Sequence, residues 1–387
     1  MNFLIAPNAL KGSLTPIEAA ESIVAALKET THGDFICCPI ADGGNGTLEC
    51  LVHARSLPTE SVRRTGGHAD GKFFSAMVTG PLRSLKVTAQ WGLLSDGMTA
   101  VIEMAEAAGL HLLKPSEYDV LHATTLGVGE LINTVLDAGF RNIIIGLGGS
   151  ATNDGGAGCA RALGARFLDE NGSEIPNGGI HLAKLTHIDC KNLDKRLNEC
   201  NITALSDVTN VLYGPNGATL VFARQKGAKE SDLQPLDNAL QHYASILKND
   251  LGKNVASLPG SGAAGGLGAG LIAFCHARIV SGIDFVLDTM RFDELLQHCD
   301  AVITAEGMID DQTLFGKGIS GIARRAEKRH KPVHAFVGKI NGNAEELKRK
   351  LHLASLYQIS PNNMMTEEAM RHARALLEGA IKKLFST

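Results

Sequence analysis

The stretch Asn142–Gly164, NIIIGLGGSATNDGGAGCARALG, joins an expected strand, a glycine-rich turn and an expected helix. The β-branched run Ile143–Ile145 is typical of a buried parallel strand, and small and apolar residues recur at helical spacing after Gly155. A unit of this kind points backbone N–H groups and the positive end of a helix at an anion. The stretch therefore predicts an α/β fold with a binding loop at the carboxyl end of this strand.

The same turn also matches a dinucleotide-binding pattern. Gly146, Gly148 and Ala151 satisfy G-x-G-x-x-A, and Asp169 follows at the distance that such sites use for a ribose-binding acid. Asp154 would, however, face a pyrophosphate with like charge unless a cation lay between them. We therefore interpret the loop as a site for a phosphate with a metal ion, or for a hydroxylated substrate.

The composition indicates a globular protein of two domains. The chain has 387 residues, 44% of them hydrophobic and 20% charged, and a net charge of −4, which favours neither nucleic acid nor an anionic membrane as a partner. Its eight cysteines show no C-x-x-C spacing, which indicates reduced thiols and argues against zinc. No signal peptide or membrane-spanning run is apparent, so we expect a cytoplasmic protein, and a homodimer is left open.

The order of elements predicts an α/β fold with two domains. Residues 1–60 and 285–387 are expected to form a discontinuous, three-layer, mainly parallel domain of the Rossmann-like or flavodoxin-like type. Residues 61–284 are expected to form an inserted, mixed α/β domain that begins with antiparallel segments at 59–66, 72–79, 84–91 and 98–103. The active site is expected in the cleft between the two domains. An alternative assigns the strand at 142–146 to the first domain.

Several local signals fix individual elements. Thr15 and Glu18 form an S/T-x-x-E capping box with Pro16 at the first helical position, which predicts a helix to Thr30. Apolar runs predict strands at 35–40 and 301–304, and periodicity predicts one terminal helix over 367–385.

Five polar clusters containing glycine or a carboxylate follow an apolar strand or precede a helix. Ligands of open α/β sheets bind beyond the carboxyl ends of strands, so these clusters are expected to share one site. They are Lys11–Ser13, Asp42–Gly44, Asn153–Gly156, Asp207–Asn210 and Glu306–Lys317.

Each carboxylate in these clusters has two interpretations. Asp42, Asp154 and Asp207 could cap a helix or turn, or could act as a base or a Mg²⁺ ligand. Lys11 could be a solvated lysine or a point charge for a phosphate, and Lys226 could lie at the surface or face a phosphate.

The run Gly260–Gly270 could hold nucleotide phosphates or could allow close helix packing. It is not a Walker A loop, because no G-x-x-x-x-G-K-[ST] occurs in the chain, and the hydrolase, zincin and protein-kinase motifs are also missing. The pattern alone predicts an α/β enzyme that handles a phosphorylated small molecule with Mg²⁺.

Seven motifs together resemble the bacterial glycerate kinase family that includes the glyoxylate- and galactarate-pathway enzymes. The resemblance runs nearly end to end and implies ATP-dependent phosphorylation of D-glycerate, to 2-phosphoglycerate, on a two-domain α/β fold. The motifs are APNALKGSLT, PIADGGNGT, IEMAEAAGL, IGLGGSATNDGGAG, SDVTNVLYGPNGATLVFARQKGA, PGSGAAGGLGAGL and VITAEGMIDDQTLFGKG.

The chain departs from the family pattern at four places. The family usually has Asp where Asn8 stands, Glu where Asn45 stands, and Gly-Glu-Gly-Arg where Ala305–Met308 stand; it has Asn-Pro-Leu at Asn210–Leu212. The first three changes remove two carboxylates and one arginine, which could shift the substrate or abolish catalysis.

The resemblance and the pattern together predict a set of site residues, with ATP and Mg²⁺ as cofactors. The expected catalytic residues are Asp42, Asp154 and Lys11, and the expected substrate-binding residues are Ser13, Asn45, Asn153 and Lys226. The expected nucleotide-binding residues are Gly260, Gly262, Gly265, Gly266 and Lys317, and the expected metal ligands are Asp207, Glu306 and Asp310.

Three alternatives to glycerate phosphorylation stay open. Asn8, Asn45 and Met308 are compatible with a kinase for a related small hydroxy acid, or with a catalytically silent member that senses glycerate or a nucleotide. The third is the dinucleotide enzyme suggested by Gly146–Ala151.

Overall fold

The structure is a computed structural model that describes residues 1–53, 71–310, 313 and 318–386. It separates into two compact units, which are the described residues of Met1–Asp42, Glu49–Asp70 and Ser281–Thr387, and those of Gly43–Leu48 and Gly71–Val280. The sequence placed these divisions near residues 60 and 285 and did not assign Gly43–Leu48 to the second unit. One division falls within α2 (Thr47–Val52).

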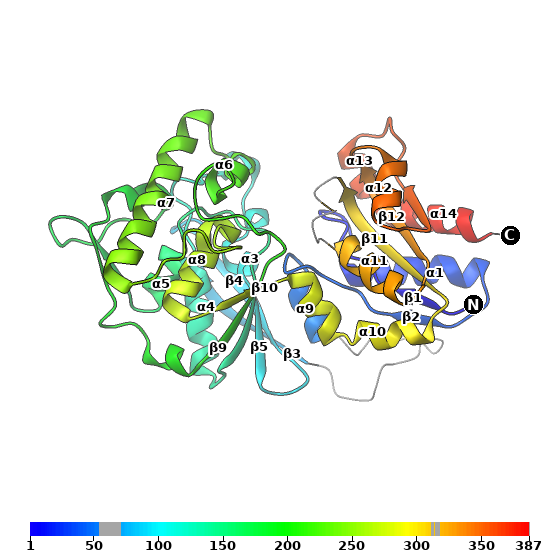
Figure 1. Ribbon diagram of the computed structural model, residues 1–387, viewed down its shortest axis with the longest axis horizontal. Helices are drawn as coiled ribbons and strands as arrows, with labels where there is room; N and C mark the ends of the chain where they lie inside the picture. The colour runs from blue at the N-terminus through cyan, green and yellow to red at the C-terminus, as the bar shows by residue number, and fades with distance from the viewer. Residues whose placement is uncertain (54–70, 311–312, 314–317, 387) are drawn as a thin grey trace. The chain divides into compact units, whose positions relative to one another are not determined.

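The first unit is built on a five-stranded sheet in which all neighbouring strands are parallel (Figure 1). The strand order is β13 (Ser355–Gln358), β12 (Val333–Ile340), β11 (Ala301–Ile309), β1 (Phe3–Ile5) and β2 (Phe35–Cys37). Its helices are α1 (Pro16–Thr30), α9 (Gly282–Thr289), α10 (Phe292–Leu295), α11 (Gly318–Lys328), α12 (Ala344–Lys350), α13 (Thr366–Arg371) and α14 (Ala373–Phe385).

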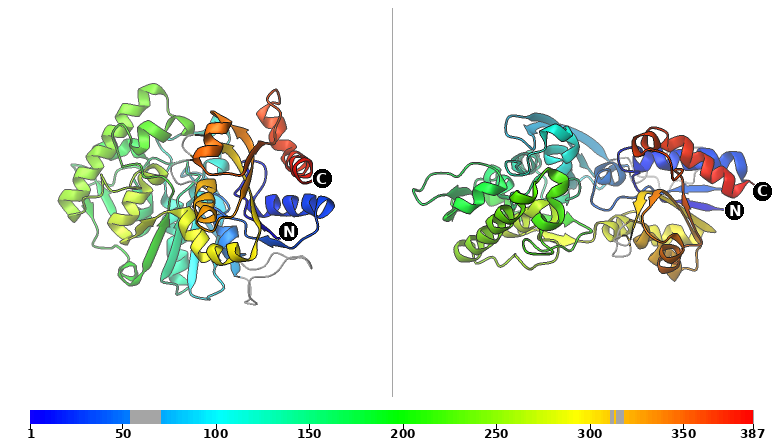
Figure 2. Two further views of the ribbon diagram at one scale, coloured as in Figure 1. Left: turned by 45° about the vertical axis from the view of Figure 1, so that its right-hand side comes forward. Right: turned by 90° about the horizontal axis from the view of Figure 1, so that it is seen from above.

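Helices cover both faces of this sheet, which gives the three layers expected from the sequence. Helices α1 and α14 lie side by side on one face, and α9, α10 and α11 lie on the other (Figure 2). The core under α1 and α14 is formed by alternate strand residues such as Phe3, Ile5 and Ile303. Because the strands are parallel, all of their carboxyl ends meet at one edge.

The second unit is built on a six-stranded mixed sheet. The strand order is β10 (Arg278–Val280), β9 (Asn201–Leu205), β6 (Asn142–Gly146), β5 (Thr99–Glu103), β4 (Lys86–Leu93) and β3 (Lys72–Thr79). The pairs from β10 to β5 are parallel and the pairs from β5 to β3 are antiparallel. The fold class expected from the sequence is therefore confirmed, and the strand at 142–146 lies in the second unit.

Helices of the second unit pack on the sheet face that carries Ile102, Ile143 and Ile145. They are α3 (Met104–Ala108), α4 (Leu126–Asp137) and α8 (Ala263–Cys275). Helix α5 (Ala157–Ala162) packs against α4 and α8, and α7 (Glu230–Leu251) packs against α8 and α6 (Ala218–Phe222). A separate antiparallel pair joins β7 (Arg166–Leu168) and β8 (His187–Asp189).

The end of β11 and the terminal helix differ from the sequence expectation, and one further expectation falls outside the described residues. Strand β11 continues to Ile309, beyond the expected end at 304, because residues 306, 308 and 309 still pair with β12. The expected terminal helix is divided at His372, whose backbone (φ −103°, ψ 11°) leaves the helical region. The strand expected at 59–66 lies outside the described residues, as do Asp311 and Lys317.

The capping box of α1 is confirmed. The Thr15 hydroxyl accepts from the Glu18 backbone N–H at 3.2 Å, and the Glu18 carboxylate accepts from the Thr15 N–H at 2.8 Å. Thr15→Ala should therefore lower the free energy of unfolding by about 1 kcal/mol, because an N–H donor at the start of α1 loses its acceptor. Urea denaturation measures the change. Glu21→Ala, an exposed change on the same helix, should have an effect of less than about 0.5 kcal/mol; equal effects would contradict the capping role.

Candidate functional site

In the second unit, two glycine loops come together at the carboxyl ends of β6 and β9. The Gly148 N–H donates to the Gly43 carbonyl at 2.9 Å. Gly43 has φ +91°, and a Cβ there would lie 2.7 Å from the Leu205 carbonyl oxygen at the end of β9. A Cβ at Gly149 would lie 2.3 Å from the Asn45 amide oxygen. The structure therefore brings exposed Asn45 against the loop after β6.

A buried glutamate supports the same loop from β5. Glu103 is the last residue of β5 and is 4% exposed. Its carboxylate accepts from the Leu48 backbone N–H at 2.6 Å, at the start of α2. The motif IEMAEAAGL contains this residue, but the sequence analysis assigned it no role. The contact holds the segment after Asn45 at the edge of the sheet.

Asp154 is buried, and its carboxylate accepts hydrogen bonds at the starts of two helices. The side chain is 1% exposed and accepts from the Thr125 N–H at 2.8 Å, just before α4. It also accepts from the Gly156 and Gly158 N–H groups at 3.1 and 3.2 Å, at the start of α5, and from the Thr125 hydroxyl. Burial raises the pKa of this carboxyl group, and the hydrogen bonds from Thr125, Gly156 and Gly158 lower it in part. This geometry favours the helix-capping interpretation of Asp154.

Lys226 is also buried, which neither interpretation of the sequence foresaw. It is 4% exposed, and its ammonium donates to the Ser150 hydroxyl at 2.7 Å and to the Thr152 carbonyl at 2.8 Å. Burial lowers its pKa from 10.5 to about 7, and the charge of Asp154 acts in the opposite direction. Lys226 therefore ties the loop after β6 to the end of α6.

Asn153 is fully buried beside this lysine-bound loop. Its amide nitrogen donates to the Thr219 hydroxyl on α6 at 2.9 Å. Among the described residues, no hydrogen-bond partner of its amide oxygen is found. The expected substrate-binding residues Asn153 and Lys226 thus lie together, and both contact protein groups in the structure.

The glycine run after Pro259 packs closely against other backbone segments. A Cβ at Gly262 would lie 2.1 Å from the Val211 carbonyl oxygen, and one at Gly265 would lie 1.9 Å from that of Thr152. Gly260, Gly265 and Gly266 have positive φ angles, and the Gly155 N–H donates to the Gly265 carbonyl at 3.0 Å. The geometry favours the close-packing interpretation of this run. Its role in nucleotide binding stays a prediction.

In the first unit, the loop after β1 lies at the carboxyl edge of the parallel sheet. Gly12 has φ +80°, and the Ser13 N–H and hydroxyl both donate to the Leu10 carbonyl at 2.8 Å. This tight turn exposes Lys11 and leaves Ser13 half-buried. Asp42, in the loop after β2, is half-buried in the same unit.

Glu306 and Asp310 lie near the carboxyl end of β11. Glu306 is within the strand, and its carboxylate and the Asn8 amide lie 3.5 and 2.9 Å from the position that a Cβ at Gly318 would take. The Asp310 carboxylate accepts from the Thr313 N–H at 3.2 Å. Met308, one of the departures noted in the sequence, is 49% exposed.

The expected metal ligands are divided between the units. Asp207 is half-buried in the loop after β9 of the second unit, whereas Glu306 and Asp310 belong to the first. Within the part of the chain that the structure describes, no group of three or more His, Cys, Asp or Glu side chains could hold a metal ion. One or two carboxylates suffice for a magnesium ion that is also bound by phosphates, so the donor types fit Mg²⁺.

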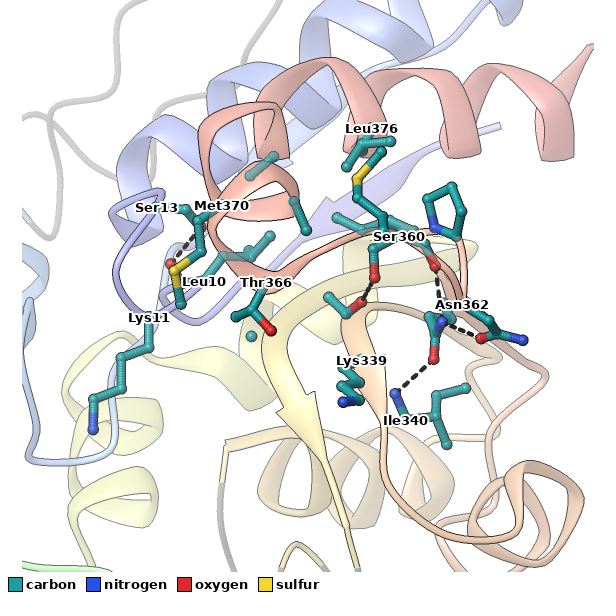
Figure 3. Close-up of a pocket in the computed structure, with 18 residues that line it drawn as sticks. Leu10, Lys11, Ser13, Lys339, Ile340, Ser360, Asn362, Thr366, Met370 and Leu376 are labelled. Atoms are coloured by element: carbon teal, nitrogen blue, oxygen red, sulfur yellow. Dashed lines mark hydrogen bonds between the residues drawn. The ribbon is translucent and has the colours of Figure 1, made fainter. Parts of the chain in front are cut away.

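The first unit contains a pocket that the sequence analysis missed. It has a volume of about 170 Å³ and lies at the ends of β11, β12 and β13 beside the loop after β1 (Figure 3). Lys11 and Ser13 are the only expected site residues among its described lining residues. The other lining residues are Leu10, Gly307 and residues within 338–340, 358–362 and 364–376. The turn Ser360–Asn362, which follows an apolar strand, was the local signal that could have revealed it.

Comparisons with known proteins agree with this architecture. The model of the glycerate kinase family matches residues 3–387. The chain is 46% identical over 341 residues to the glycerate 2-kinase of Escherichia coli (strain K12), which covers 88% of this chain and 86% of that protein. It is 42% identical over 379 residues to the glycerate kinase of Bacillus subtilis (strain 168), with coverages of 98% and 95%.

A solved structure shows the same fold. The crystal structure of a protein described as glycerate kinase 2 from Salmonella typhimurium LT2 matches with a TM-score of 0.80 and 40% identity, and the match covers 100% of this chain and 97% of that one. The chain belongs to the glycerate kinase family, and it is an enzyme, a kinase. In the described residues, no helix combines the length and apolar character that crossing a membrane requires.

The buried position of Lys226 predicts a pH dependence of stability. Its folded-state pKa of about 7 lies below its ordinary value of 10.5, so the unfolded chain binds one more proton between these two values. The free energy of unfolding should therefore rise with pH in this window, by about 2 kcal/mol between pH 7 and pH 9.

Lys226→Met should remove this rise, and urea denaturation at several pH values measures it. Lys248→Met, which changes an exposed lysine of α7, should leave the slope unchanged. An equal pH slope in wild type and Lys226→Met would show that Lys226 keeps an ordinary pKa.

Proposed function

We propose that the protein catalyses the ATP-dependent phosphorylation of D-glycerate to 2-phosphoglycerate. The observation that carries the proposal is the 46% identity, over 88% of this chain, to a protein named glycerate 2-kinase. The geometry supports it, because phosphoryl transfer asks mainly for positioned groups and neutralised charge, and polar loops lie at the carboxyl edge of each sheet. We also propose a cytoplasmic location, where the eight free cysteines would stay reduced.

Within this proposal, Asp42 accepts the proton of the attacking hydroxyl. Of the two carboxylates considered for this role, Asp154 is only 1% exposed, whereas Asp42 is half-buried in a loop after a strand. A base must reach a substrate proton within hydrogen-bond distance, which favours Asp42. We propose that Asp154 instead keeps the loop after β6 in place.

The remaining residues divide between substrate contact and support. Lys11 and Asn45 are exposed and Ser13 is half-buried, so we propose that these three bind the phosphate and the substrate. Asn153 and Lys226 are buried, so we propose that they act by positioning the loop.

Glu306, Asp310 or Asp207 would hold Mg²⁺ together with the phosphates of ATP, and the ion would neutralise charge on the transferred group. These side chains come from the ends of β11 and β9, and each carries the hard oxygen ligand that Mg²⁺ prefers.

One observation favours a second candidate, a kinase for a related small hydroxy acid. Asn8 lies beside Glu306 near Gly318, where an aspartate would place two carboxylates close together. The chain therefore carries one negative charge fewer at this point than the usual family pattern. A substrate with a different charge or size would be accommodated by such a change.

Phosphorus NMR of the product tests the proposed reaction. With ATP, Mg²⁺ and D-glycerate, the spectrum should show ADP and a single phosphomonoester signal that coincides with added 2-phosphoglycerate. A signal that coincides with 3-phosphoglycerate would contradict the proposed position. Turnover of another dihydroxy acid at a kcat/KM ten times higher than that of D-glycerate would favour the second candidate.

Asp42→Asn tests the proposed base. The variant should lower kcat by about 10²-fold or more, because the amide cannot accept the proton, while the urea midpoint stays near that of wild type. Glu21→Gln, an exposed change in the same unit, should keep the wild-type kcat. Near-wild-type turnover of Asp42→Asn would rule out this assignment.

A further inference from the structure

The pocket of the first unit extends from the point where the strand order of its sheet reverses, between β1 and β11, to the ends of β12 and β13. From β1, the chain continues to β2 on one side, whereas β11, β12 and β13 extend from the other side. Open α/β sheets bind ligands in the crevice at such a switch point, beyond the carboxyl ends of the strands. Leu10, Lys11 and Ser13 from the β1 loop and Gly307 from β11 line the pocket at this point.

Backbone packing holds the two sides of the crevice together. A Cβ at Gly307 would lie 3.0 Å from the Lys11 backbone nitrogen, and one at Gly338 would lie 2.5 Å from the Gly307 carbonyl oxygen. The loop after β1 and the ends of β11 and β12 are therefore in close contact. Met370 of α13 reaches the same loop, because its terminal methyl lies 3.4 Å from the Cβ position of Gly12.

One part of the wall is apolar. It is formed by the side chains of Leu10, Ile340, Ile359, Met364, Met370 and Leu376. A small polyhydroxy acid would leave this apolar surface exposed to water, whereas the face of a flat heteroaromatic ring would bury it. Methionine sulfur makes favourable contacts with aromatic rings. The apolar wall therefore favours a ring over a sugar acid.

The other part of the wall carries an ordered set of amide groups. The Gln358 amide oxygen accepts from the Ile340 N–H at 2.9 Å, and its amide nitrogen donates to the Ser360 carbonyl and to the Asn362 amide oxygen, both at 2.8 Å. These bonds occupy Gln358 and the Asn362 amide oxygen, so the NH₂ group is the part of the Asn362 side chain that can donate to a ligand. A purine offers ring nitrogens as acceptors for such a donor.

The charges on the lining favour an anionic ligand. Among the described residues that line the pocket there are two lysines, Lys11 and Lys339, and no carboxylate. Both lysines are exposed, and the Lys11 side chain extends outward from the other labelled residues (Figure 3). A volume of about 170 Å³ encloses a ring but not a whole nucleotide, so the phosphates would extend toward these ammonium groups.

We propose that this pocket binds the adenine ring of the ATP, with the phosphates directed toward Lys11 and Lys339. The proposal rests on the proposed kinase function and replaces the glycine run Gly260–Gly266 as the nucleotide site. Backbone packing already fills the space around that run, because a Cβ at Gly266 would lie 2.8 Å from Gly155 Cα.

Ala369→Phe tests the proposal, because Ala369 lines the pocket and a phenyl ring would fill it. Calorimetric titration with ADP should show an affinity at least tenfold weaker than in wild type, and the KM for ATP should rise by a similar factor while the KM for D-glycerate stays unchanged. The matched control Ala375→Phe changes an exposed residue of α14 that does not line the pocket, and it should bind ADP like wild type.

Two further measurements test the proposal even if Ala369→Phe does not fold. Asn362→Ala, an exposed change, should also weaken ADP binding but not the binding of inorganic tripolyphosphate. Photolabelling with 8-azido-ATP should modify residues within 338–376, and protection by ATP should abolish the label. Labelling confined to 255–275, or an unchanged ADP affinity in a folded Ala369→Phe, would overturn the proposal.

The same titrations separate this proposal from the proposed reaction. If wild type phosphorylates D-glycerate and Ala369→Phe keeps its ADP affinity, the pocket assignment fails and the reaction stands. If wild type releases no ADP with D-glycerate, and Ala369→Phe binds ADP more weakly than wild type does, the substrate assignment fails and the nucleotide site stands.

Discussion

The second unit depends on the buried carboxylate of Asp154. This side chain accepts hydrogen bonds from backbone N–H groups at the starts of α4 and α5 and from the Thr125 hydroxyl. Hydrogen bonds to a charged group contribute about 1.5–3 kcal/mol each, and a buried donor that loses its acceptor costs a similar amount. Lys226 lies near this carboxylate, whose charge acts against the lowering of the Lys226 pKa by burial, and holds the preceding loop through Ser150 and Thr152. Removing the carboxylate would leave the buried N–H groups that it accepts from without their acceptor.

The glycine-rich sequence around Asp154 follows from this arrangement. A Cβ at Gly158 would lie 2.2 Å from the Thr124 hydroxyl, and one at Gly155 would lie 2.5 Å from the Tyr243 ring. Larger residues at either position would push these loops away from the carboxylate. The loops of the candidate site are therefore fixed by packing, and a rigid support of this kind can keep catalytic groups in a productive geometry. Asn45, which lies against the loop after β6, is exposed to solvent at this edge of the sheet.

Local sequence signals predicted the strands, the α1 capping box and the carboxyl edges on which the polar loops lie, because each depends on residues a few positions apart. The burial of Lys226 depends on contacts across 76 residues, and the role of Asp154 depends on a contact across 29 residues. The spacing of apolar residues along the sequence does not indicate contacts between distant residues, so Lys226 and Asp154 were both interpreted as residues of the site. The pocket was missed because three strand ends and α13 form it together, and α13 was expected to continue into the terminal helix.

We propose that Asp154 organises the loop after β6 instead of exchanging protons with the substrate. Amide hydrogen exchange of Asp154→Asn, measured by mass spectrometry together with kcat of the folded protein, tests it most directly. We expect protection to fall in peptides that contain Thr125 and Gly156–Gly158 but not in the parallel sheet of the first unit, and kcat to stay within about tenfold of wild type. Unchanged protection with a kcat lowered by 10³-fold or more would contradict the account.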